Sequence, residues 1–166
     1  MTKIQKITPH LWFPKGAEKA VKFYISVFKN SKVLGTSYYT KAGKEIHKMK
    51  PGSVLTIDFL IEGQRFTALN GGPLFKFNES ISFMVHCETQ DEIDYYWKKL
   101  KKDGDPKAQQ CGWLKDKFGV SWQIAPSMVF EMITDKNKKK VEHFMAAMMK
   151  MKKLDLAKLE KAYNKS

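Results

Sequence analysis

Two histidines occupy matching places in the two halves of this 166-residue chain, and histidine is both a common metal ligand and a proton carrier near neutral pH. His10 lies in the run ITPHLWF and His86 in the run ISFMVHC. Each run has the β-branched and aromatic residues typical of a strand, and each is followed by a helical pattern. A duplicated unit could therefore place two imidazoles around one shared site.

Each half of the chain predicts the same order of elements: a strand, a helix and three strands. In the first half we expect strands at 5–13, 33–40, 54–61 and 65–70, and a helix at 17–28. In the second half we expect strands at 81–88, 107–110, 112–116 and 120–125, with a helix that begins in the capping-box sequence TQDE at 89–92. Beyond Pro126 the pattern becomes helical, with a helix at about 136–152 and another beginning at Asp155.

The candidate site follows from the alternation of side chains across a strand, because residues two apart share a face. If the apolar neighbours face the helices, His10, Asn70, His86 and Gln123 are the polar residues that their strands turn the other way. Thr56 and Asp58 are further candidates from a central strand, and the tryptophans could form the pocket wall. The predicted ligand pocket consists of His10, Trp12, Thr56, Asp58, Asn70, His86, Trp113 and Gln123.

Several strings in the chain resemble the vicinal oxygen chelate superfamily, which includes glyoxalases, extradiol dioxygenases and proteins of fosfomycin and bleomycin resistance. The resemblance is specific to its PhnB-like branch, also labelled demethylubiquinone methyltransferase-like. The strings are TPHLWF at 8–13, ALNGGP at 68–73, FKFNE at 75–79, VHCETQ at 85–90, CGWLKD at 111–116 and FGVSWQ at 118–123. Together they cover roughly residues 5–130.

The resemblance implies an α+β fold of two βαβββ modules, which form an open mixed sheet or half-barrel around a pocket. We expect the first module at 1–73, the second at 74–130 and a helical extension at 131–166. Pairing of halves between subunits is a habit of this family. The resemblance therefore also implies a homodimer, with strand exchange between subunits as one form of it.

Metal-using members of the superfamily hold a divalent ion through the first strand of each half and a glutamate on the last strand. His10 and His86 fit the first two positions, but Gln123 stands where the glutamate belongs. Glutamine is a neutral ligand, so this set lacks the anion that normally helps to hold zinc, manganese, iron or magnesium. We expect a divalent metal at His10, His86 and Gln123 to be weakly bound or absent.

The resemblance implies a small-molecule pocket protein, and a lyase or isomerase is one version of it. The alternative is a protein that binds or sequesters a small ligand without catalysis, as bleomycin-resistance proteins do. The sequence shows no Gly-rich strand-turn-helix suited to S-adenosylmethionine, so we do not expect methyltransferase activity. Whether the chain is an enzyme, which residues would be catalytic and what the ligand is stay open at this stage.

The composition limits the partners. The formal charge of +13 would favour nucleic acid, yet Arg65 is the only arginine, and ten lysines against four acids from Asp135 onward supply +6 of the charge. We interpret this lysine-rich tail as a solvated helix face rather than a nucleic-acid site.

No apolar run approaches the roughly 20 residues of a membrane helix and no signal-peptide pattern begins the chain, so we expect a cytoplasmic protein without a membrane partner.

Overall fold

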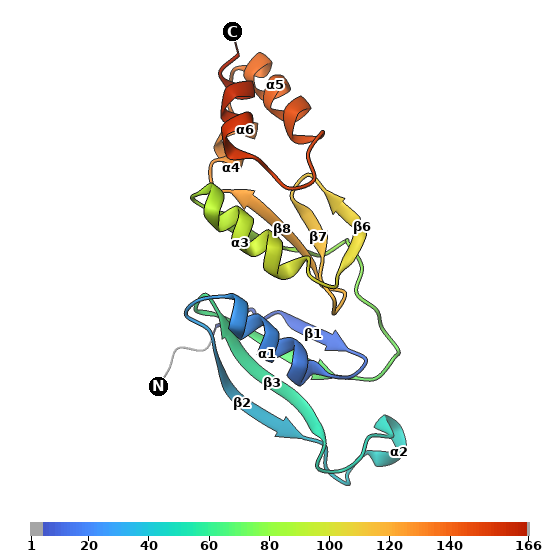
Figure 1. Cartoon of the computed structure of the whole chain (residues 1–166). Coiled ribbons are helices and arrows are strands. Elements are labelled where there is room, and N and C mark those ends of the chain that lie inside the picture. Colours follow the sequence, from blue (N-terminus) through green and yellow to red (C-terminus); the bar gives the residue numbers. More distant parts are fainter. Residues whose placement is uncertain (1–4, 166) are drawn as a thin grey trace. The chain divides into compact units, whose positions relative to one another are not determined.

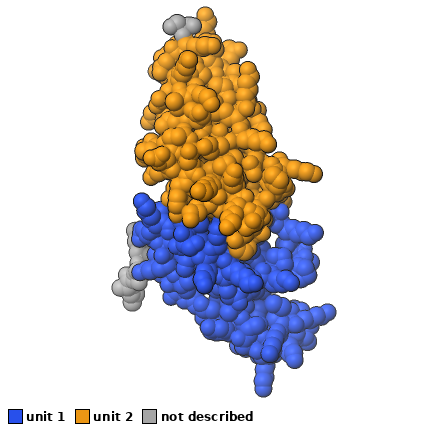
Figure 2. All heavy atoms as spheres, viewed as in Figure 1, with its two compact units in different colours: residues 1–77 blue, residues 78–166 orange. Residues whose placement is uncertain are grey.

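The computed structural model describes residues 5–165, which divide into two compact units between Phe77 and Asn78 (Figure 2). The division between Phe77 and Asn78 lies four residues beyond the boundary expected from the sequence. The C-terminal helices belong to the same unit as the second module. Each unit is described by itself below.

The first unit is one four-stranded sheet with a helix on one face (Figure 1). Its elements are β1 (His10–Phe13), α1 (Ala17–Val27), β2 (Lys32–Tyr38), α2 (Lys44–His47), β3 (Val54–Ile61) and β4 (Gln64–Asn70). The strand order is β1-β4-β3-β2, with β1 parallel to β4 and the other pairs antiparallel. The short helix α2 lies in the loop at 41–52, where the sequence predicted no element.

The second unit repeats this topology and then adds three helices. Its elements are β5 (Phe83–Cys87), α3 (Gln90–Leu100), β6 (Asp105–Gln110), β7 (Trp113–Lys115), β8 (Ser121–Pro126), α4 (Val129–Ile133), α5 (Lys138–Met148) and α6 (Leu156–Tyr163). The strand order is β5-β8-β7-β6, with β5 parallel to β8. The predicted α+β fold of two βαβββ modules with open mixed sheets is therefore confirmed.

Apolar residues at helical spacing explain why α1 and α3 cover their sheets. In α1 the buried residues are Ala17, Ala20, Val21, Tyr24 and Val27, and in α3 they are Ile93, Trp97 and Leu100. The ring of Tyr24 stacks on Phe59 of β3, with centroids 6.5 Å apart. Burying this surface leaves the opposite face of each sheet free of the module's own helix.

The three C-terminal helices build a second core against the end of β8. Phe144 of α5 and Leu159 of α6 are fully buried, together with Leu154 between the two helices. Asp155 caps α6 by accepting a hydrogen bond from the amide of Lys158, 3.0 Å away. None of the helices at residues 5–165 is long and apolar enough to cross a membrane.

Candidate functional site

The open face of the first sheet brings three polar residues into one row. His10 of β1 lies opposite Thr67 of β4, which in turn lies opposite Asp58 of β3. Paired residues on neighbouring strands point to the same face, so the three side chains share the side away from α1. His10 is exposed, whereas its neighbours Leu11 and Phe13 are buried under the helix, as the sequence predicted.

Asp58 is the charged centre of this row. Its carboxylate accepts a hydrogen bond of 2.7 Å from the Thr67 hydroxyl and pairs with the guanidinium of Arg65. Burial pushes the pKa of Asp58 upward. The hydrogen bonds of Thr67 and Arg65 and the charges of Arg65 and His10 outweigh burial and hold this pKa below its usual range. The open face therefore presents a carboxylate that is fully ionised at neutral pH.

Trp12 forms an apolar wall beside this row. Its indole nitrogen donates to the carbonyl of Gly72 at 2.9 Å, and its ring meets Phe75 edge to face with centroids 4.9 Å apart. A Cβ at Gly71 would come within 2.3 Å of the Trp12 ring, so only glycine allows the chain to pass here. Leu69 lies opposite Trp12 and continues the wall on the same face.

Thr56 also lies on the open face, because it is paired with Leu69 across β3 and β4. Its hydroxyl is 2.6 Å from the hydroxyl of Ser37 on β2, which extends the polar surface to the edge of the sheet.

Asn70 does not share this face, and that part of the prediction is wrong. It is paired with buried Phe13 and is only 5% exposed, on the side of α1. Its amide oxygen accepts from the backbone of Ala17 at 2.9 Å, and its amide nitrogen donates to Glu18 and to the carbonyl of Val54. The first amides of a helix need acceptors, so Asn70 is engaged in capping α1.

Arg65 and Thr67 are the residues that sequence reasoning missed on the open face. The alternation in β4 carried the signal: if Asn70 faces the helix with Ala68, then Thr67 and Arg65 must face the other way. Leu69 misled the prediction for β4, because we expected its apolar side chain to face the helix, and it lies on the open face instead.

In the second unit His86 and Gln123 lie on the face away from α3. Gln123 of β8 is paired with Met84 of β5 and with Trp113 of β7, so these side chains share the face of His86. The Gln123 amide nitrogen donates to the Ser82 hydroxyl at 2.8 Å. The amide oxygen is thus the atom that could meet a ligand.

Cys87 lies next to His86 but points into the core. Burial, together with the negative charges of Glu92 and Glu88, raises the pKa of its thiol to about 12. The thiol is therefore not a nucleophile at neutral pH.

Neither unit by itself has a ligand set suited to a divalent ion. Among residues 5–165 there is no group of three His, Cys, Asp or Glu side chains that could hold one. His86 and Gln123 include no anionic ligand, and in the first unit Asp58 is already bound by Arg65 and Thr67. His10 lies in the other unit from these two, so a site shared by His10, His86 and Gln123 stays a prediction.

Comparison with solved structures identifies the class of fold. A protein from Pseudomonas aeruginosa is 13% identical, with a TM-score of 0.56, over 74% of this chain and 98% of that one. The fosfomycin resistance protein FosX of Listeria monocytogenes is 15% identical, with a TM-score of 0.52, over 81% of this chain and 100% of that one. The paired βαβββ modules and these likenesses define a vicinal oxygen chelate fold.

The family within that class is also clear. Residues 5–125 match the family model of 3-demethylubiquinone-9 3-methyltransferase. A PhnB protein of Bacillus cereus is 37% identical, with a TM-score of 0.62, over 74% of this chain and 99% of that one. The chain belongs to this family, the PhnB-like branch of the superfamily. A comparison with curated proteins gave no match.

Proposed function

We propose that this chain is a small-molecule pocket protein whose ligand lies on the open faces of its sheets. The observation that carries the proposal is the row of His10, Thr67 and Asp58 beside Trp12. Pockets for small molecules combine an apolar wall with a few fixed polar groups, and this face has both. Arg65 and Thr67 hold the Asp58 carboxylate in place without a ligand.

The same groups support a lyase or isomerase version of the function. His10 is exposed and lies opposite Thr67, which binds Asp58, so a ligand on this face would meet an imidazole together with the Asp58–Arg65 ion pair. An exposed imidazole can act as a general acid or base. A divalent ion held by His10, His86 and Gln123 would add Lewis-acid polarisation of a ligand oxygen.

The non-catalytic alternative remains a second proposal with its own observation. The second unit presents His86 with Trp113, Met84 and the neutral amide of Gln123, a surface suited to packing against a ligand rather than to proton transfer. In that version the protein binds or sequesters its ligand unchanged. In both versions we propose a homodimer, with strand exchange as one form of it.

The test is a thermal-shift screen of small molecules on the intact protein, followed by NMR detection of turnover for every stabilising compound. We expect a ligand that stabilises the wild type and whose effect falls by half or more in His10→Ala. His47→Ala is the control, since His47 is a half-buried histidine of α2 that lies outside the candidate site. Equal ligand effects in both variants would remove His10 from the site.

The wild type and the His10→Ala variant also distinguish the enzyme from the sequestering protein. Product formation that is lost in His10→Ala supports the enzyme, whereas tight binding without product supports the sequestering protein. Elemental analysis of protein incubated with manganese or zinc tests the metal. If one ion per chain remains bound in wild type and is lost in both His10→Ala and His86→Ala, the ion is part of the function.

A further inference from the structure

A second cavity lies in the C-terminal helices, beyond residues 5–125 that define the family. It has a volume of about 580 Å³ and lies between α5 and α6 and the turns that follow them. Its lining residues are His143, Ala146, Ala147, Lys150, Met151, Lys158, Lys161, Ala162 and Lys165. This volume is within the range of small-molecule sites.

The lining residues form one stripe on each helix. On α5 and the turn after it they occupy positions 143, 146, 147 and 150, and on α6 and the residues after it positions 158, 161, 162 and 165. Each set has the spacing i, i+3, i+4 and i+7 of residues that share one face of a helix. The cavity is therefore a groove to which both helices contribute two turns.

The groove has an apolar floor and a cationic rim. The floor is formed by the small alanines of both helices and by Met151, and the rim by Lys150, Lys158, Lys161 and Lys165. No acidic residue lines the groove in the described part of the chain. Lys158 pairs with the nearby Asp155 at 3.0 Å, and within residues 5–165 it is the one rim lysine in a salt bridge.

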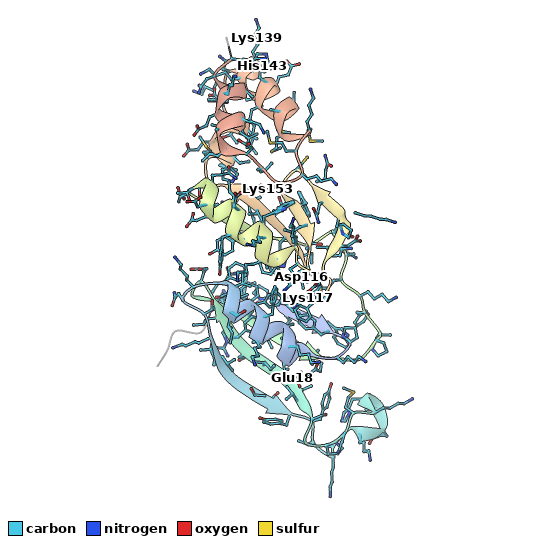
Figure 3. The ribbon with its side chains drawn as sticks, in the orientation of Figure 1. Glu18, Asp116, Lys117, Lys139, His143 and Lys153 are labelled. Carbon is cyan, nitrogen blue, oxygen red and sulfur yellow. The ribbon has the colours of Figure 1, made fainter. Side chains whose placement is uncertain are left out.

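His143 adds a polar group to this groove. It lies on α5 (Figure 3), lines the groove, and its Nδ1 atom is buried without a hydrogen-bond partner among the described residues. A buried polar atom without a partner costs free energy. Nδ1 itself is not exposed, so a ligand oxygen would remove that cost only if the ring turned toward the groove.

We propose that this groove binds an amphiphilic anion, a molecule with an aliphatic chain and a carboxylate, sulfate or phosphate head. The chain would cover the alanine floor, the head would meet the lysine rim, and the lysine stems would extend along the chain. Charge complementarity favours this occupant, because four lysines without a lining acid attract an anionic head and repel a cationic one. The site is independent of the ligand proposed for the open sheet faces.

The test is calorimetric titration of the full chain with dodecanoate below its micellar concentration, at two salt concentrations. We expect one site per chain, weaker binding at the higher salt and no comparable binding of dodecyltrimethylammonium, which has the same chain and the opposite charge. Equal binding of the two amphiphiles, or no binding of dodecanoate, would overturn the proposal. Tighter binding of a poly-glutamate peptide would overturn it in favour of an acidic protein partner.

Two matched pairs of variants locate the site. Lys161→Glu should weaken dodecanoate binding roughly tenfold, because an attraction between the lysine and the anionic head becomes a repulsion. Lys139→Glu is the control and should have a smaller effect, because it changes the net charge equally at an exposed position of α5 outside the groove. Ala146→Phe should block the floor, whereas Ala157→Phe places the same ring on an exposed position of α6 that does not line the groove. All four positions are exposed, so folding should be retained, and unfolding temperatures check this. Equal effects within either pair would contradict the groove as the site.

Discussion

The two modules share one topology but place their carboxylates differently. In the first module Asp58 lies on the open face of β3, next to β4, which carries Arg65; His10 lies one strand further, on β1. In the second module Asp116 is buried in the turn before β8, where it accepts hydrogen bonds from the backbone of Phe118 and Val120 and from the Trp122 indole. One carboxylate is partly exposed on a sheet face and paired with Arg65, and the other is buried and holds a turn.

The pairing of the strands also shows which residues lie beside the histidine in each module. His10 is paired with Thr67 and His86 with Ala125, and Arg65 and Gln123 each lie two residues before the partner of a histidine. This place beside the histidine holds a cation in the first module and a neutral amide in the second. The two histidines therefore have surroundings that differ in charge.

The largest expected effect is the loss of stability when the buried carboxylate of Asp116 is removed. Asp116→Ala should lower the free energy of unfolding by about 3–5 kcal/mol, because two backbone amides and one indole N–H would lose their buried acceptor. Asp58→Ala should cost only about 1 kcal/mol, since Asp58 and Arg65 are each about one-third exposed. Urea unfolding of the two variants measures both values. Equal losses would mean that Asp58 is as structural as Asp116.

A smaller effect compares the starts of the two sheet-covering helices. Asn70→Ala should cost about 2 kcal/mol, because the helix α1 loses a buried acceptor that comes from a strand 53 residues away. Thr89→Ala should cost about 1 kcal/mol, since it removes only the local cap that accepts from Glu92 in α3. Urea unfolding again gives both numbers. A larger loss in Thr89→Ala would contradict the assignment of Asn70 to the helix.

The smallest effect is the pH dependence due to Asp58. Its pKa is lowered in the folded protein, so its ionised form stabilises the fold above the unfolded pKa, near pH 4, and this stability is lost as the pH falls through the folded value. Between pH 5 and pH 2 the free energy of unfolding of the wild type should therefore fall by about 1 kcal/mol more than that of Asp58→Asn. Unfolding by urea at several pH values measures the difference. Identical curves for the two proteins would show that Asp58 has no lowered pKa.

The elements of this fold were largely predictable because their signals are local. The strand over 54–61 has the predicted bounds, α1 ends one residue earlier than expected, and Thr89 and Asp155 cap their helices as their positions indicated. The short helix α2 was missed, since its four residues carry no periodic pattern and its ends depend on Gly43 and Lys48 in left-handed conformations.

The sequence by itself determined the duplicated βαβββ order, the family and the faces of His10, Thr56, Asp58, His86 and Gln123, because alternation and helical spacing are properties of the chain. Only the tertiary structure decided the role of Asn70, and it alone revealed Arg65 and Thr67 as neighbours of Asp58. The physical reason is that the amides at the start of α1 needed an acceptor, and that need settled which face of β4 turned toward the helix. The groove in the lysine-rich tail also depends on tertiary structure, because its lysines line one surface only when α5 and α6 pack together.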